Sequence, residues 1–193
     1  LGHGIVMGGG YGLFSASKYR VLTERSRLAF PEITIGLFPD AGGTIVMRKL
    51  APKMAALLTL TGSQVNATDA LALGIGTHVI GHEARAEFVA GLLKLSWQRG
   101  ARKTNDEVLE GYLARHAFTG DMPASDVDAV HVHRIDLSSL SACADSILAL
   151  EGTSKWMDRG AANLRAGCPI TAGIIFKQLS LGPRMDLDEW FMS

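Results

Sequence analysis

Near its start the chain reads Gly4-Ile5-Val6-Met7-Gly8-Gly9-Gly10, and further along it reads Phe30-Pro31-Glu32-Ile33-Thr34-Ile35-Gly36-Leu37-Phe38-Pro39-Asp40-Ala41-Gly42-Gly43. Three successive glycines expose backbone N–H groups without a Cβ in the way, which suits a turn that approaches a ligand or opens a helix. Such a turn can hold the negative charge that develops on an oxygen atom during a reaction. We therefore take Gly8-Gly9-Gly10 as one half of a candidate site.

The other half is a pair of carboxylates, Glu32 and Asp40. Both lie among apolar residues, glycine and proline, which is poor company for a solvated charged face. Burial beside a second carboxylate raises the pKa of at least one carboxyl group, and acid and base catalysis commonly uses such a pair. Pro31 also restricts the backbone before Glu32. The pattern predicts two carboxylates at fixed positions in one site.

Other familiar catalytic patterns are missing from the sequence. It has no Gly-x-Ser-x-Gly elbow, no phosphate-binding loop ending in Gly-Lys-Ser/Thr and no dinucleotide fingerprint. His131-Val132-His133 alternates like a strand, but no neighbouring ligand completes a metal set, so we expect no metal site. Arg25 and Arg27 flank a turn where a phosphate could bind, although solvated side chains are the more ordinary interpretation.

The two quoted stretches, followed by Leu60-Thr61-Gly62, resemble the enoyl-CoA hydratase/isomerase (crotonase) superfamily, and within it the 3-hydroxyisobutyryl-CoA hydrolase branch. The weaker match Cys168-Pro169-Ile170-Thr171 resembles the C-terminal region of that branch. The resemblance implies an α/β (α+β) fold, a crotonase-like (ClpP/crotonase) spiral of β-β-α units with a C-terminal helical region. Residues 1–81 would be the C-terminal part of the core and carry the active site, and residues 82–193 would cover the pocket.

The same resemblance implies an acyl-CoA thioester hydrolase that acts on a short 3-hydroxyacyl-CoA, as in valine catabolism. Gly9, beside Gly8, would donate its backbone N–H to the thioester oxygen. Glu32 would act as the nucleophile or as the base for water, and Asp40 would orient the substrate hydroxyl or the water. Coenzyme A would be part of the substrate, so no cofactor is expected. Lys177 is a candidate contact for a coenzyme A phosphate.

Two alternatives stay open. An enoyl-CoA hydratase or isomerase is the first, although the related hydratases carry a glutamate where this chain has Gly12. The second is a non-catalytic subunit or scaffold with the same fold. The chain opens at Leu1 inside an expected buried strand, so we expect sequence upstream of this start and a second oxyanion donor within it.

Composition sets outer limits on function. With 193 residues, 47% hydrophobic residues and 20% charged residues, the chain suits one globular domain. Lys+Arg and Asp+Glu number 19 each, which gives no broad basic surface for nucleic acid. Cys143 and Cys168 have no metal-type spacing and are expected as reduced thiols. We expect no membrane span, a possible homo-oligomer, and a cytoplasmic location in a bacterium or the mitochondrial matrix in a eukaryote, without secretion.

Local patterns predict alternating elements up to residue 81 and mostly helices beyond it. Strands are expected over residues 2–7, 19–24, 28–30 and 77–80, and helices over residues 11–17, 44–50, 53–60, 67–73 (with Asn66 as N-cap), 83–98, 106–116, 140–150, 154–166 and 170–181. The stretch from Gly120 to Asp128 is expected to be a connection.

Overall fold

The computed structural model describes residues 1–37 and 43–181. In chain order these residues form β1 (Ile5–Met7), α1 (Gly9–Ser15), β2 (Val21–Thr23), β3 (Arg27–Ala29), the 3-10 helix η1 (Glu32–Ile35), α2 (Gly43–Met47), α3 (Pro52–Thr61), β4 (Val65–Asn66), α4 (Ala67–Ala72), β5 (His78–Ile80), α5 (Arg85–Leu92), α6 (Arg102–Arg115), α7 (Ala129–Val132), α8 (Leu140–Leu148), α9 (Lys155–Ala166) and α10 (Pro169–Leu181).

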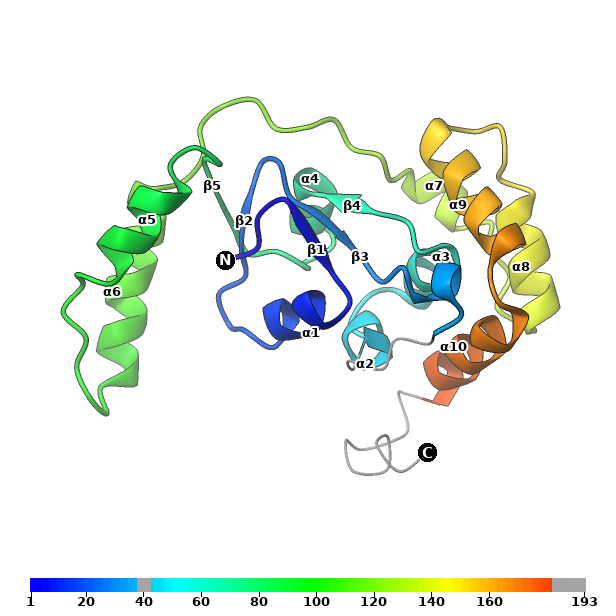
Figure 1. Cartoon of the computed structure of the whole chain (residues 1–193), viewed down its shortest axis with the longest axis horizontal. Helices are drawn as coiled ribbons and strands as arrows, with labels where there is room; N and C mark the ends of the chain where they lie inside the picture. Colours follow the sequence, from blue (N-terminus) through cyan, green and yellow to red (C-terminus); the bar gives the residue numbers. More distant parts are fainter. Residues whose placement is uncertain (38–42, 182–193) are drawn as a thin grey trace.

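The strands form two small sheets at the centre of the molecule (Figure 1). In the first, β3 lies between β1, which is parallel to it, and β4, which is antiparallel. In the second, β2 and β5 pair in parallel. An isolated bridge between Gly2 and Leu22 links the start of the chain to β2. The mixed α/β class expected from the sequence is confirmed.

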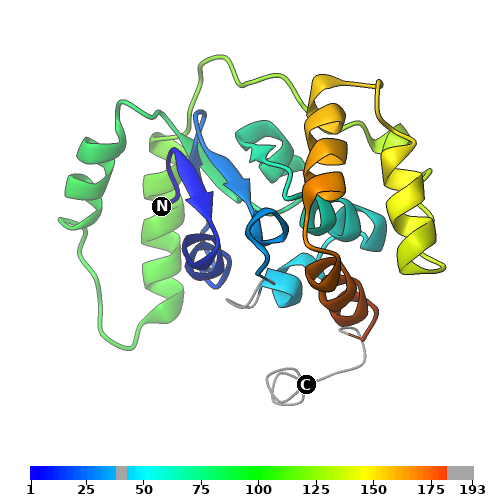
Figure 2. The same cartoon turned by 45° about the vertical axis from the view of Figure 1, so that its right-hand side comes forward.

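The main hydrophobic core is built around α3. Eight of its ten residues, from Met54 to Thr61, are buried. Because this helix is apolar on nearly all sides, it suits a position enclosed by other elements. Helices α8, α9 and α10 pack against it on the side away from α5 and α6, as Figures 1 and 2 show.

The helices after residue 81 lie in two separate places. Helices α5 and α6 lie together on one side of the molecule (Figure 2). They form a smaller core with the β2–β5 sheet, in which Phe88 and Tyr112 pack beside Ile80. Helices α7 to α10 lie on the opposite side, around α3. The connection between the two groups is irregular, as predicted. Asn66, the last residue of β4, holds it in place, because its Nδ2 donates to Ala124 O at 2.7 Å.

Side-chain caps fix several helix starts. Asn66 Oδ1 accepts from the Asp69 N–H at 3.0 Å, so the predicted N-cap of α4 is confirmed. Ser154 caps α9 in the same way. The strand-like alternation at residues 131–133 does not form a strand. Asp128 accepts from the Val130 N–H and starts the short helix α7, with Val132 turned into the core.

Candidate active site

Two parallel strands bring the glycine turn and Glu32 to the same edge of a sheet. The register pairs Ile5 with Arg27 and Met7 with Ala29, so β1 and β3 end side by side. Gly8 follows β1 directly, and Glu32 follows β3 after two residues. Carboxyl ends of parallel strands meet at one edge of a sheet, which is where open α/β folds place their ligand sites.

Gly8 has a backbone conformation that needs glycine. Its φ of 51° and ψ of −127° lie in a region that residues with a Cβ adopt only under strain. A Cβ placed on Gly8 would lie 3.4 Å from Oε1 of Glu32, which shows how close the carboxylate comes to the turn. The glycine turn and Glu32 therefore form one structural unit.

Gly9 is the first residue of α1, so its N–H has no acceptor within the helix. Gly9 and Gly10 are exposed, and a Cβ on either would meet nothing within 4 Å. The positive end of the helix dipole lies at the same place. A backbone donor without an intrahelical acceptor, next to Gly8 and its contact with the buried Glu32, can bind a carbonyl oxygen on which negative charge develops.

The backbone of Glu32 is firmly held. Glu32 is 6% exposed and lies in the first turn of η1, where its carbonyl accepts from Leu37 N at 3.1 Å. Helix α10 begins against the same segment, since Cys168 N donates to Ile33 O at 3.2 Å. Gly62 packs so closely that a Cβ there would lie 3.2 Å from Pro31 Cα. These contacts fix the position from which the Glu32 side chain reaches the turn.

An aromatic pair lies behind the turn. Tyr11 and Phe30 stack with ring centroids 4.3 Å apart and an interplanar angle of 10°. Tyr11 is fully buried, and within residues 1–37 and 43–181 its hydroxyl has no hydrogen-bond partner. Burial raises the pKa of Tyr11, so the phenol stays neutral. The stack joins the first turn of α1 to the end of β3.

The sequence also singles out Asp40, Lys177 and Gly12. Asp40 lies outside the described residues. Lys177 is exposed on α10, and its contact with a phosphate stays a prediction. Gly12 is the fourth residue of α1, and its N–H donates to Gly8 O at 3.0 Å, so it supports the helix start.

His131 takes part in a local contact with an acidic side chain. His131 Nδ1 lies 3.2 Å from Asp128 Oδ2, within a pair three residues apart. Throughout the described part of the chain, no group of three His, Cys, Asp or Glu side chains is arranged to hold a metal ion. Cys143 and Cys168 are free, and burial raises the pKa of Cys143 to about 11. No described helix has the length and apolar character needed to cross a bilayer.

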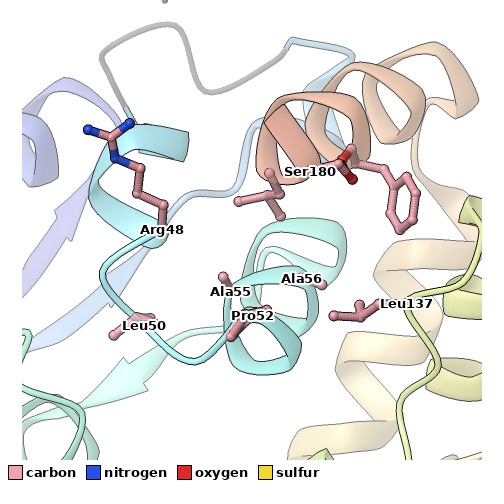
Figure 3. A pocket seen from close by; sticks show the side chains of 9 residues that line it. Arg48, Leu50, Pro52, Ala55, Ala56, Leu137 and Ser180 are labelled. Atoms are coloured by element: carbon pink, nitrogen blue, oxygen red, sulfur yellow. Dashed lines mark hydrogen bonds between the residues drawn. The ribbon is translucent and has the colours of Figure 1, made fainter. Parts of the chain in front are cut away.

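An apolar cavity of about 250 Å³ lies between α3 and α10, and none of the predicted site residues within the described part of the chain lines it (Figure 3). Pro52, Ala55 and Ala56 form one wall, and Phe176 of α10 and Leu137 form another. The guanidinium of Arg48 points away from Ala55 and Ala56. No sequence pattern predicts this cavity, because its two walls come from segments more than 80 residues apart.

A sequence profile of the enoyl-CoA hydratase/isomerase family matches residues 1–193, the whole chain. The chain belongs to this family. The superfamily resemblance drawn from the glycine turn and the Glu32 segment is thus confirmed.

Several curated relatives carry the name 3-hydroxyisobutyryl-CoA hydrolase. The mitochondrial 3-hydroxyisobutyryl-CoA hydrolase of Xenopus laevis is 31% identical over 189 residues, which cover 96% of this chain and 48% of the relative. The Homo sapiens protein of the same name is 40% identical over 110 residues, covering 57% of this chain and 28% of the relative. The chain spans about half the length of the relatives that it matches throughout.

Solved structures of family members share the fold. A carnitinyl-CoA dehydratase from Mycobacterium thermoresistibile matches with a TM-score of 0.76 at 22% identity, covering 98% of this chain and 53% of that one. An enoyl-CoA hydratase from Rhodobacter sphaeroides matches with a TM-score of 0.69 at 22% identity, covering 97% and 51%. At this identity the matches establish the crotonase-like fold and leave the reaction to be argued from the site.

Proposed function

We propose that this protein hydrolyses a short-chain 3-hydroxyacyl-CoA thioester, with 3-hydroxyisobutyryl-CoA as the first substrate to test. The observation that carries the proposal is the position of Glu32, whose Oε1 lies against Gly8 at the open start of α1. The name 3-hydroxyisobutyryl-CoA hydrolase, carried by relatives that match nearly the whole chain, supports the choice of substrate.

The chemistry follows from this geometry. The Gly9 N–H donates to the thioester oxygen and stabilises the charge that builds there, an effect worth about 3 kcal/mol for one fixed donor. In one route, Glu32 attacks the acyl carbon, the C–S bond breaks, and water hydrolyses the resulting anhydride. In the other, Glu32 takes a proton from water, which attacks the acyl carbon directly. Both routes consume one water and release an acid and a thiol.

Two further residues complete the proposal. Asp40 orients the substrate hydroxyl or the water and helps to protonate the departing thiolate. Lys177 contacts a phosphate of coenzyme A. The thioester is reactive enough for a carboxylate or an activated water, so these residues suffice without a cofactor.

The alternative within the same family is hydration or isomerisation of an unsaturated acyl-CoA. The family's description and the names of its solved members keep this alternative open. Gly12 argues against it, because the two-glutamate hydratase mechanism implied by the resemblance has one of its glutamates at this position. In such a hydratase or isomerase, Asp40 would transfer a proton to or from a carbon atom of the substrate.

The decisive experiment compares the two reactions in one preparation. Thiol release from 3-hydroxyisobutyryl-CoA is followed with a thiol reagent, and hydration of a short unsaturated acyl-CoA is followed by loss of its ultraviolet absorbance. We expect thiol release only, and we expect Glu32→Gln to lower it at least a hundredfold. Glu87→Gln, at an exposed position on α5, is the matched control and should retain activity. Retention of hydrolysis within a few-fold in Glu32→Gln would end the proposal.

A non-catalytic role on the same fold is tested by binding. Calorimetric titration with a non-hydrolysable thioether analogue of the substrate should give one saturable event that Glu32→Gln leaves largely intact. A chain that binds the analogue but never releases thiol would support the scaffold alternative.

A further inference from the structure

A hollow of about 360 Å³ lies between α9 and the segment from Gly62 to Gln64, and it reaches the start of β3. Glu32 follows the carboxyl end of β3, whereas Arg27 is the first residue of this strand and lines the hollow. Lys155 and Arg159 of α9 line it as well. Three positively charged side chains from two distant segments thus surround one concave surface.

Helix geometry explains how α9 contributes twice. Lys155 and Arg159 are four residues apart, so they lie on the same face of the helix, one turn from each other. Trp156 anchors this end of α9, because its Nε1 donates to Gln64 O at 2.6 Å, just before β4. The helix is therefore fixed relative to the sheet edge that carries Arg27.

The positive charge of the hollow is poorly compensated. Within residues 1–37 and 43–181, Arg27, Lys155 and Arg159 take part in no ion pair, whereas Arg25 pairs with Glu83 at 2.9 Å. One carboxylate, Asp126, also lines the hollow, which leaves three positive charges against one negative.

Lys155 has a reason of its own to need an anion, and Asp126 is already engaged elsewhere. Lys155 is the first residue of α9, where the helix dipole is already positive and a cation is unfavourable. The carboxylate of Asp126 already accepts from Asn66 Nδ2 at 3.0 Å. A bound dianion would relieve the repulsion among the cations.

We propose that this hollow binds the phosphate group of a small phosphorylated ligand. Arginine and lysine bind phosphate oxygens through charge-assisted hydrogen bonds, and a phosphate dianion matches the net charge of the hollow. Free phosphates and the phosphate groups of a nucleotide-like molecule such as coenzyme A share this chemistry. The site does not depend on the hydrolase activity proposed above.

The probe for this site is inorganic pyrophosphate at low ionic strength. Binding is followed by NMR through the indole N–H of Trp156, with the indole of Trp97, which does not line the hollow, as the internal reference. A Trp156→Phe sample assigns the resonance. We expect a saturable shift of the Trp156 signal that weakens as salt is added.

Charge-removing variants test the residues. Lys155→Gln and Arg159→Gln change exposed side chains, so the fold should survive, and each should raise the Kd for pyrophosphate about tenfold. Lys94→Gln and Arg99→Gln, at exposed positions after α5, are the matched controls and should change the Kd less than twofold. No saturable shift, or equal losses in the control variants, would overturn the proposal.

Three further ligands identify the source of the phosphate. Tighter binding of coenzyme A than of pyrophosphate, lost in Arg159→Gln, would assign the site to the phosphates of coenzyme A; equal binding would assign it to free phosphates. Dephospho-coenzyme A then shows whether the 3′-phosphate is the group recognised. Stronger binding of an acidic peptide than of any phosphate would refute the proposal. Because these readouts need no turnover, they are independent of the outcome for hydrolysis.

Discussion

Replacement of Gly8 by alanine should destabilise the protein, although the same change two residues later should stabilise it. A Cβ on Gly8 would meet only Oε1 of Glu32, at 3.4 Å, which is ordinary van der Waals contact. The cost therefore comes from the backbone: with φ at 51° and ψ at −127°, an alanine here is strained by about 1–3 kcal/mol.

Gly10→Ala is the matched control. Gly10 lies inside α1, has no positive φ, and has nothing within 4 Å of its Cβ position. Alanine at this position reduces the freedom of the unfolded chain and should raise the free energy of unfolding by about 0.5–1 kcal/mol. The two variants should therefore differ by about 1.5–4 kcal/mol, the sum of the two ranges.

The assay is urea unfolding followed by circular dichroism, with thermal unfolding as a second measurement. For a chain of this size, each kcal/mol corresponds to about 2–4 °C in Tm. Thiol release at a temperature where both variants are folded then shows whether Gly8→Ala also moves the turn away from Glu32. A Gly8→Ala protein as stable as Gly10→Ala would refute the strained-turn reasoning.

Three further changes test neighbouring features. Tyr11→Phe should leave the free energy of unfolding unchanged or raise it, because the buried hydroxyl that it removes makes no hydrogen bond within the described residues. Tyr112→Phe loses a hydrogen bond to a backbone carbonyl and should lower the free energy of unfolding by about 0.5–1.5 kcal/mol. Urea unfolding measures both. At pH 8 a thiol reagent should label Cys168 before Cys143, because hydrogen bonds from the Thr171 backbone lower the pKa of Cys168 whereas burial raises that of Cys143; simultaneous labelling would contradict this. Gly62→Ala should lower Tm more than Gly8→Ala, because Gly62 has a φ of 59° and its new Cβ would lie 3.2 Å from a backbone carbon. An equal or smaller loss of Tm would show that the backbone before η1 shifts to make room for the methyl group.

Much of the fold could be predicted from local sequence because its signals are local. The cap at Asn66, the cap at Ser154 and the glycine turn before α1 each mark a helix start within a few residues. Two elements, β4 and η1, could not be predicted from local sequence. The two residues of β4 are too few for a period, and η1 is a single tight turn whose four residues carry no helical pattern.

The site could be predicted in its parts but not in its geometry. The glycine and carboxylate motifs identify Gly9 and Glu32 as candidates. The two residues come close together only because β1 pairs in parallel with β3, and no local sequence pattern predicts that pairing. The hollow beside Arg27 was missed for a similar reason, since its other cations come from α9. The alternation at His131 and His133 resembles a strand, but Asp128 caps a helix start just before it, so a helical turn forms instead.

The three residue pairs between β1 and β3 set the distance between the Gly9 amide and the Glu32 carboxylate. An extra residue between Ala16 and Arg20 can be taken up by the loop there, since the ladder that follows is unchanged. An extra residue between Ala29 and Glu32 would advance the carboxylate by about 3.3 Å along the strand direction and turn it to the other face. Insertions should therefore be tolerated between Ala16 and Arg20 and should disrupt the site between Ala29 and Glu32.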